Sequence, residues 1–296
     1  MKVFVTGGSG WVGKHVVPEL IAHGHKVLAL ARSNDAAKAL EGQGAQVVRG
    51  TLEDIDILQS SAKDSDAVIH LAYIHDFANF AGKPAQVDFA AVKALCSALA
   101  GTNKPFVGTS GLVGLGGEQN ETDKAGGGQR QESEDIAFSF TSKGLRPIVI
   151  RLAPCVHGDG DWGFIVFLTK IAKEKGHTAY IDKGDNEWVG VHVKDAAKLY
   201  RLVIENQSIP GGTALHAAEP KGLKFKQVSE IINKKLDLKE EPKSVSGDQA
   251  GEYFGFMKHF AGGNTQPKTQ ITKNLTGWEL TEKTLEEDLE TGTYFD

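Results

Sequence analysis

The chain has 296 residues, of which 40% are hydrophobic and 24% charged, and this ordinary globular composition excludes a disordered or collagen-like protein. Its formal net charge of −5 provides no global attraction to nucleic acid or anionic lipid, so we expect neither as a partner. Two cysteines, Cys96 and Cys155, are too few for a disulfide framework and match no zinc-binding spacing. No apolar run approaches the ~18 residues of a membrane span, and a strand-like segment at the start leaves no room for a signal peptide. We therefore expect a cytoplasmic protein.

The first half of the chain alternates short β-rich apolar runs with longer segments of helical periodicity. This alternation is typical of βαβ units that build a parallel sheet. The expected strands are residues 2–6, 26–31, 46–48, 67–71, 105–107 and 146–152. The expected helices are residues 12–23, 34–42, 53–61, 84–100 and 131–143. These elements predict an α/β fold of the Rossmann type, with a doubly wound parallel sheet.

After Leu152 the regular alternation stops, which predicts a smaller, substrate-binding lobe. Shorter helices are expected at residues 161–175, 194–206, 225–236 and 281–290. We predict a dinucleotide-binding core of residues 1–155, re-entered by 187–210, and a lobe of residues 156–186 and 211–296. The polar, glycine-rich segment from Gly114 to Asp135 follows the fifth strand, where active sites of such sheets lie, and is either a lid or a solvated loop.

A glycine-rich motif lies between the first strand and the first helix, where residues 6–13 read Thr-Gly-Gly-Ser-Gly-Trp-Val-Gly. Glycine permits positive φ, lets the backbone approach a pyrophosphate and lets the helix pack closely on the strand, while the helix N-terminus offers free amides to phosphates. The alternative is a tight turn that binds nothing. We expect a dinucleotide, and the predicted contact residues are Gly7, Gly10, Trp11, Val12 and Gly13.

Six segments together resemble the extended or atypical short-chain dehydrogenase/reductase superfamily, which includes the NAD-dependent epimerase/dehydratase proteins. They are residues 6–13, 49–54, 68–72, 108–111, 151–158 and 275–278, and they follow the order of that family. The resemblance covers nearly the whole chain and implies a Rossmann core that binds a nicotinamide dinucleotide. The implied cofactor lining comprises Leu52, Leu71, Ala72, Ser110 and Pro154. Thr51 stands where the family usually has an Asp near the adenine, which weakens that one contact.

The cofactor preference can be argued from charge at the end of the second strand. NAD-specific Rossmann proteins have an acidic residue there, which hydrogen-bonds the ribose 2′-hydroxyl and would repel a 2′-phosphate. This chain has Arg32 and Ser33 instead. A guanidinium and a hydroxyl suit a phosphate dianion, so NADP(H) is favoured over NAD, although an exposed arginine without such a role is the alternative.

The catalytic pair of the superfamily is absent. Its reductases carry Tyr-x-x-x-Lys on the helix after the fifth strand, where the lysine lowers the tyrosine pKa so that the phenol exchanges a proton with the substrate carbonyl. The best alignment places Arg130 and Glu134 at these positions. Ser110, the usual hydrogen-bond partner of the carbonyl, is retained.

Replacement proton donors are expected at the carboxyl ends of strands. Tyr73 and His75 follow the fourth strand, and His157, a weaker candidate, follows the sixth. A histidine with a pKa near 6.5 is a better acid at neutral pH than a tyrosine near 10, so His75 has the more favourable intrinsic chemistry. The predicted catalytic residues are Ser110, His75 and Tyr73.

Three classes of function are compatible with these residues. The first is an NADP(H)-dependent oxidoreductase that acts on a carbonyl or related C=O or C=N group of a small, fairly apolar molecule. The second is an epimerase or dehydratase in which the nicotinamide is reduced only transiently. The third is a non-catalytic dinucleotide-binding sensor, which the missing Tyr-Lys pair favours. The sequence predicts the first, with a small-molecule substrate, and leaves the substrate's identity and the oligomeric state open.

Overall fold

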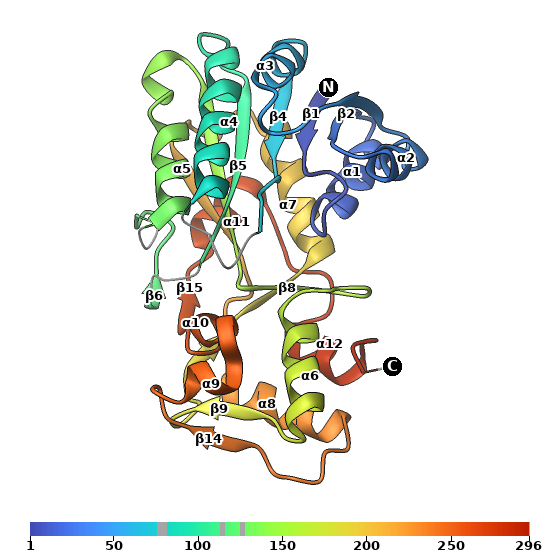
Figure 1. Cartoon of the computed structure of the whole chain (residues 1–296). Coiled ribbons are helices and arrows are strands. Elements are labelled where there is room, and N and C mark those ends of the chain that lie inside the picture. Colours follow the sequence, from blue (N-terminus) through green and yellow to red (C-terminus); the bar gives the residue numbers. More distant parts are fainter. Residues whose placement is uncertain (76–81, 113–115, 125–127, 296) are drawn as a thin grey trace.

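A seven-stranded parallel sheet forms the centre of the larger half of the molecule (Figure 1). The computed structural model describes residues 1–75, 82–112, 116–124 and 128–295. The strand order is β12-β7-β5-β4-β1-β2-β3. The strands are β1 (Lys2–Thr6), β2 (Lys26–Ala31), β3 (Gln46–Arg49), β4 (Ala67–His70), β5 (Pro105–Gly111), β7 (Arg146–Leu152) and β12 (Thr213–Ala217). The doubly wound α/β fold expected from the sequence is confirmed.

Helices cover both faces of this sheet, which explains why its central strands are nearly continuous apolar runs. One face packs against α1 (Gly13–Ala22), α2 (Asn34–Gly42) and α7 (Val193–Glu205). The other packs against α3 (Ile55–Lys63), α4 (Lys83–Leu99) and α5 (Gly128–Phe138). The carboxyl ends of the strands point toward the smaller half, so the loops that follow them lie between the two halves (Figure 1).

The seventh strand corrects the expected domain boundary. Residues 211–296 were expected in the lobe, but β12 pairs with β7 in the central sheet, from Thr213 opposite Ile148 to Ala217 opposite Leu152. Further along, α11 (Gln270–Thr276) and the fully buried Trp278 also pack on the sheet side of the molecule. The segment Thr-Ala-Leu-His-Ala has one large aliphatic residue, so its strand character comes from the ladder with β7 rather than from its own pattern.

The lobe is built from short elements around its own hydrophobic cluster, and α12 (Leu285–Thr291) closes that cluster through Leu285 and Leu289. Its strands are β8 (Cys155–His157), β9 (Ala179–Ile181), β10 (Glu187–Trp188), β13 (Leu223–Lys224), β14 (Lys243–Val245) and β15 (Thr265–Pro267). β11 (Gly190–His192) pairs with β8, and its Val191 belongs to the hydrophobic cluster of the central sheet. Its helices are α6 (Phe164–Lys175), α8 (Phe225–Lys235), α9 (Ala250–Phe254), η2 (Gly255–Met257), α10 (Lys258–Ala261) and α12 (Leu285–Thr291). Across the described part of the chain, no helix is both long and apolar enough to span a bilayer.

The glycine-rich segment from Gly114 to Asp135 is only partly described. It contains β6 (Gly117–Gln119), which pairs with β15, and the first turns of α5. Residues 113–115 and 125–127 lie outside the described residues, and the alternatives of a lid and a solvated loop stay open. A short 3-10 turn, η1 (Thr141–Lys143), separates α5 from β7.

Candidate functional site

The glycine turn after β1 has two glycines that the fold itself requires, Gly7 and Gly13, and a third, Gly10, that is exposed to solvent. Gly7 has φ +73°, and a Cβ there would lie 2.5 Å from the Ala72 nitrogen. A Cβ on Gly13 would lie 2.1 Å from the Gly7 oxygen, which explains the close approach of α1 to the turn. Gly10 is exposed, and a Cβ there would meet only the Gly7 oxygen, at 3.2 Å. The turn therefore leaves an open approach at Gly10, beside the N-terminus of α1, where an anion is favoured.

Trp11 joins this turn to the lobe. Its indole Nε1 donates a hydrogen bond to the Val156 carbonyl oxygen on β8 at 2.7 Å. The ammonium nitrogen of Lys14 lies 4.1 Å from the centre of the Trp11 ring, a cation–π contact. The turn and the first lobe strand are thus fixed to each other, and Val12 lies at the start of α1 beside them.

Two arginines lie at the carboxyl ends of β2 and β3. Arg32 is exposed directly after β2, and Ala31 pairs with Arg49 across the two strands. Arg49 donates hydrogen bonds to the Ser33 carbonyl oxygen and, at 3.1 Å, to Asn34 Oδ1. Ser33 caps α2, because its Oγ accepts a hydrogen bond from the Ala36 amide at 3.2 Å. The predicted Arg32-Ser33 pair is therefore joined by a second cation, Arg49, that the sequence analysis did not assign to this site.

The remaining predicted lining residues differ in accessibility. Leu71, Ala72 and Pro154 are half-buried at the strand ends, whereas Leu52 is buried in the cluster on the sheet face that α3, α4 and α5 cover.

The Thr51 amide and hydroxyl both donate to Asp54 Oδ2, at 2.7 and 2.8 Å, so Thr51 and Asp54 close a local turn before α3.

Ser110 on β5 has a buried hydroxyl that lacks a hydrogen-bond partner among the described residues. Its neighbour Thr109 is different, because its hydroxyl contacts both the His70 carbonyl oxygen and the Tyr200 hydroxyl, each at 2.8 Å. A buried hydroxyl without a partner costs about 1–3 kcal/mol, which a bound oxygen atom would recover. This property fits the predicted role of Ser110 as a hydrogen-bond donor to a substrate carbonyl.

A buried polar network lies between the end of β4 and helices α4 and α5. The Nδ1 atom of His70 is 2.7 Å from the Thr6 hydroxyl, and its Nε2 atom is 3.1 Å from Asp88 Oδ1. The Ser133 hydroxyl donates to the second Asp88 oxygen. His70 is 3% exposed and Asp88 1%. Sequence reasoning missed this network because its members come from four separate elements.

The two residues aligned with the absent Tyr-Lys pair have different environments. Glu134 forms a buried ion pair with Arg151 of β7, with its Oε2 atom 2.8 Å from Nη2. Arg130 lies 3.8 Å from Asp88, and its guanidinium carbon is 3.9 Å from the centre of the Tyr73 ring. Glu134 is thus structural, whereas Arg130 faces a predicted catalytic residue.

Tyr73 and His75 lie together after β4, with ring centres 5.4 Å apart in an edge-to-face arrangement. Desolvation raises the pKa of the Tyr73 phenol, and the Arg130 charge opposes this shift. Desolvation, assisted by the Arg130 charge, lowers the pKa of the His75 imidazole. At neutral pH His75 is therefore mainly neutral, and Tyr73 carries its proton beside a cation.

His157 does not face this site. It is fully buried on β8, with Nδ1 2.9 Å from Asp288 and Nε2 3.2 Å from Glu219. Burial lowers its pKa, but the hydrogen bonds and charges of the two carboxylates exceed this effect and raise it above the ordinary value. An imidazolium enclosed by two carboxylates fixes α12 to the lobe, and we assign it a structural role.

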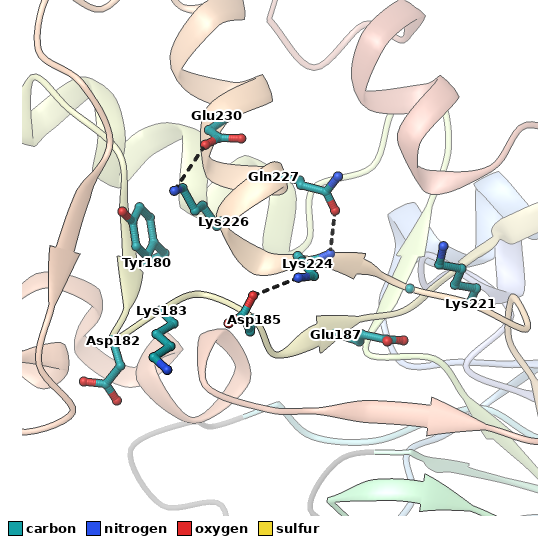
Figure 2. A pocket seen from close by; sticks show the side chains of 11 residues that line it. Tyr180, Asp182, Lys183, Asp185, Glu187, Lys221, Lys224, Lys226, Gln227 and Glu230 are labelled. Carbon is teal, nitrogen blue, oxygen red and sulfur yellow. Dashed lines mark hydrogen bonds and ion pairs between the residues drawn. The ribbon is translucent and has the colours of Figure 1, made fainter.

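The lobe also has an open hollow of about 800 Å³ (Figure 2). Basic and acidic side chains alternate around it and neutralise one another. Lys224 pairs with Asp185 at 2.8 Å, and Lys226 with Glu230 at 3.9 Å, as the dashed lines show. Because no side chain there combines burial with an unpaired polar atom, the hollow lacks the properties of a built site.

Comparison with known proteins identifies the family. The model of the NAD dependent epimerase/dehydratase family matches residues 3–217. The chain belongs to this family. An uncharacterized protein of Saccharomyces cerevisiae is 36% identical over 296 residues, which cover 98% of each chain. A decarboxylating sterol-4-alpha-carboxylate 3-dehydrogenase of Dictyostelium discoideum is 46% identical over a shorter stretch of 71 residues. This stretch covers 24% of the present chain and 22% of the dehydrogenase.

Solved structures show the same fold over the whole chain. The UDP-glucose 4-epimerase of Thermotoga maritima, solved with UDP-glucose, has a TM-score of 0.76 at 20% identity and covers 100% of this family member and 98% of its own chain. A dTDP-glucose 4,6-dehydratase of Streptomyces venezuelae, solved with NAD, has a TM-score of 0.76 at 17% identity, with coverage of 100% and 97%. The superfamily resemblance is confirmed, while the preference for NADP(H) and the catalytic residues stay predictions.

Proposed function

We propose that this family member is an NADP(H)-dependent oxidoreductase that reduces a C=O or C=N group of a small, fairly apolar molecule. The observation that carries the proposal is the pair of exposed arginines, Arg32 and Arg49, at the ends of β2 and β3. An acidic residue after β2 would accept hydrogen bonds from a ribose 2′-hydroxyl, but two guanidinium groups suit a 2′-phosphate. Ser33, already fixed as the cap of α2, retains its hydroxyl proton for the same phosphate.

The residues at the strand ends fit the rest of the dinucleotide. The open backbone at Gly10 and the N-terminus of α1 would hold the pyrophosphate, and the half-buried Leu71, Ala72 and Pro154 would line the cofactor. When bound, the reduced nicotinamide supplies a hydride. The unpaired hydroxyl of Ser110 would donate a hydrogen bond to the substrate oxygen.

The contact of Arg130 with the Tyr73 ring favours Tyr73 over His75 as the proton donor, although the intrinsic pKa values favour His75. Desolvation and the Arg130 charge lower the pKa of His75, which reduces the fraction of imidazolium at neutral pH. Tyr73 keeps its proton there, and its ring lies against the Arg130 guanidinium. We therefore assign Ser110 to orientation of the substrate and Tyr73 to proton donation.

Calorimetric titration with NADPH and NADH tests the cofactor preference. A charge-assisted hydrogen bond contributes about 1.5–3 kcal/mol, so NADPH should bind at least about tenfold more tightly than NADH. Arg32→Ala and Arg49→Ala should each reduce this ratio by weakening only NADPH binding. Lys170→Ala, which removes an exposed cation on α6, serves as the control. Equal affinities in the wild type would contradict the proposal.

Consumption of NADPH with a panel of carbonyl compounds tests the reaction. Ser110→Ala and Tyr73→Phe should each lower the rate on the best substrate by roughly 10²- to 10⁴-fold, without a change in NADPH affinity. The family match makes an epimerase or dehydratase the second candidate. That function requires conversion of substrate without net NADPH consumption, whereas binding without any turnover would indicate the sensor.

A further inference from the structure

Arg130 occupies the place of the superfamily's tyrosine on α5 and nevertheless faces a phenol that comes from another element. We propose that Tyr73 and Arg130 together form the proton-donating pair of this site, and that buried Asp88 is the positioning residue that holds Arg130 against the Tyr73 ring. The inference rests on the proposed function for the substrate chemistry. The pair itself is inferred from the contacts of Arg130 on α5 with Asp88 on α4 and with Tyr73 after β4.

Asp88 is suited to hold a cation because it is a buried carboxylate with several donors directed at it. Burial alone would raise its pKa, but the hydrogen bond and charge of His70, the charge of Arg130 and the Ser133 hydrogen bond hold it below the ordinary value. Asp88 therefore stays ionised, 1% exposed, with Arg130 3.8 Å from its Oδ2 atom. An unpaired carboxylate at this depth would be strongly unfavourable, so the charge of Asp88 restricts where Arg130 lies.

His70 fixes the other side of this carboxylate. Its Nε2 atom lies 3.1 Å from Asp88 Oδ1, and its Nδ1 atom lies 2.7 Å from the Thr6 hydroxyl oxygen. The Thr6 oxygen in turn lies 3.4 Å from the Ala72 amide nitrogen. The chain of contacts thus extends from the cofactor-lining Ala72 to Arg130, and it connects the two walls of the site through buried groups.

Arg130 can do for Tyr73 what the lysine does in the superfamily pair. A guanidinium remains charged at every pH used by enzymes, and it stabilises a phenolate that forms next to it. Its carbon lies 3.9 Å from the ring centre, within the range of a cation–π contact. The cation here comes from α5 and the phenol from the segment after β4, so two elements supply what one helix supplies in the superfamily.

Reduction of a carbonyl at this site transfers one hydride and one proton to the substrate. The substrate carbon accepts a hydride from the reduced dinucleotide, and a C–H bond forms as the π pair of C=O moves to oxygen. That oxygen takes the phenolic proton of Tyr73, so the O–H bond of Tyr73 breaks and an alcohol forms. The phenolate left beside Arg130 regains a proton from water. The dinucleotide is oxidised and the substrate is reduced.

A site-specific titration tests the pair without any substrate. A fluorinated tyrosine incorporated at position 73, whose fluorine atoms lower the phenol pKa into an accessible range, is followed by ¹⁹F NMR. Among the residues that the structure describes, the charged groups that face it are Arg130 of α5 and Asp88 of α4. His75 on the same segment is replaced by glutamine to remove a second titration. Arg130→Gln should raise the phenol pKa by about one unit or more, and Arg130→Lys by less. Glu132→Gln, an exposed change on α5, should have no effect.

The positioning role of Asp88 is tested by coupling. If Asp88 holds Arg130 in place, Arg130→Gln should shift the phenol pKa at position 73 by at most about half as much in an Asp88→Asn background. Such a reduction is expected for coupled residues. The same shift in both backgrounds would overturn the role of Asp88. Ser133→Ala, which removes one neutral donor from Asp88 and keeps every charge, replaces Asp88→Asn if that variant fails to fold. Ser133→Ala should likewise reduce the phenol pKa shift that Arg130→Gln causes.

Kinetics separate failure of the pair from failure of the proposed function. In the reductive direction Tyr73 must be protonated, so kcat falls at high pH. Arg130→Gln should lower kcat and move the fall of kcat at high pH to a still higher pH. Arg130→Lys should restore part of kcat and part of the pH at which kcat falls, while KM stays near the wild-type value. If no carbonyl compound consumes NADPH, the proposed function fails while the ¹⁹F titration still decides the pair. If NADPH is consumed but neither the titration nor the pH limb responds to Arg130, the pair is wrong and the reductase stands.

Discussion

Restoring the superfamily's lysine at position 134 should destabilise this protein rather than improve it. Glu134 is 2% exposed and binds Arg151, which is also 2% exposed. Arg151 Nε lies 3.1 and 3.3 Å from the two carboxylate oxygens, and Nη2 lies 2.8 Å from Oε2. Among the described residues, Nη1 has a single contact, with His216 Nε2 at 3.5 Å. Removing the carboxylate leaves the buried guanidinium almost without acceptors, which costs about 3–5 kcal/mol.

A lysine adds repulsion to this loss. Two cations about 4 Å apart repel by about 4 kcal/mol at an effective dielectric constant of 20, and the whole stability of a domain is about 5–15 kcal/mol. We expect Glu134→Gln to lower the free energy of unfolding by about 3–5 kcal/mol, and Glu134→Lys to lower it further or to prevent folding. Denaturant unfolding followed by circular dichroism measures both. Glu132→Lys is the matched control, since it makes the same charge change on the exposed side of α5. If Glu134→Lys were as stable as this control, the structural role of Glu134 would be refuted.

Three further predictions concern the glycine turn and the lobe. Gly13→Ala should lower the free energy of unfolding by about 1–3 kcal/mol in denaturant titration, because its Cβ would lie 2.1 Å from a backbone oxygen of the turn. Gly10→Val should keep a near-wild-type unfolding midpoint but abolish calorimetric binding of both NADPH and NADH; retained binding would place the pyrophosphate elsewhere. His157 has a raised pKa in the folded state, so its charge stabilises the fold fully below its ordinary pKa of 6.5 and loses this effect as pH rises through the folded-state value. The stability difference between wild type and His157→Gln should therefore shrink as pH increases above 6.5, and a pH-independent difference would contradict the buried imidazolium.

Strands and helices with their own strong pattern were predictable from the sequence. The limits expected for β1, β2, β7 and α2 agree with the structure, because each has a run of apolar or helix-forming residues bounded by a turn or a cap. β5 was expected to end at 107 but continues to Gly111, since Gly108, Thr109 and Ser110 belong to the sheet through their pairing with β7. β12 was missed for the same reason, as its strand character depends on a partner more than 60 residues earlier.

Only part of the candidate site could be predicted from the sequence. The glycine turn and Arg32 could be predicted because local spacing fixes their positions relative to strands, and Ser110 could be predicted because its segment resembles the superfamily. Arg49, Asp88 and Arg130 could not be placed, because their roles depend on which side chains the tertiary fold brings together. His70 lies inside a segment that resembles the superfamily, but its contact with Asp88 joins β4 to α4, and periodicity within one element contains no information on such a contact.

The late strand β12 and the buried Trp278 have a consequence for how the chain folds during its synthesis. The indole of Trp278 donates to the Asp195 carbonyl oxygen at 2.8 Å, and Trp278 belongs to the same hydrophobic cluster as Val3 and Val5 at the start of the chain. Until residue 217 has left the ribosome, the sheet lacks its edge strand β12, and until residue 278 has left it, the sheet side lacks the packing of Trp278 on α7. The half of the protein that contains the sheet therefore stays incomplete while most of the lobe is synthesised.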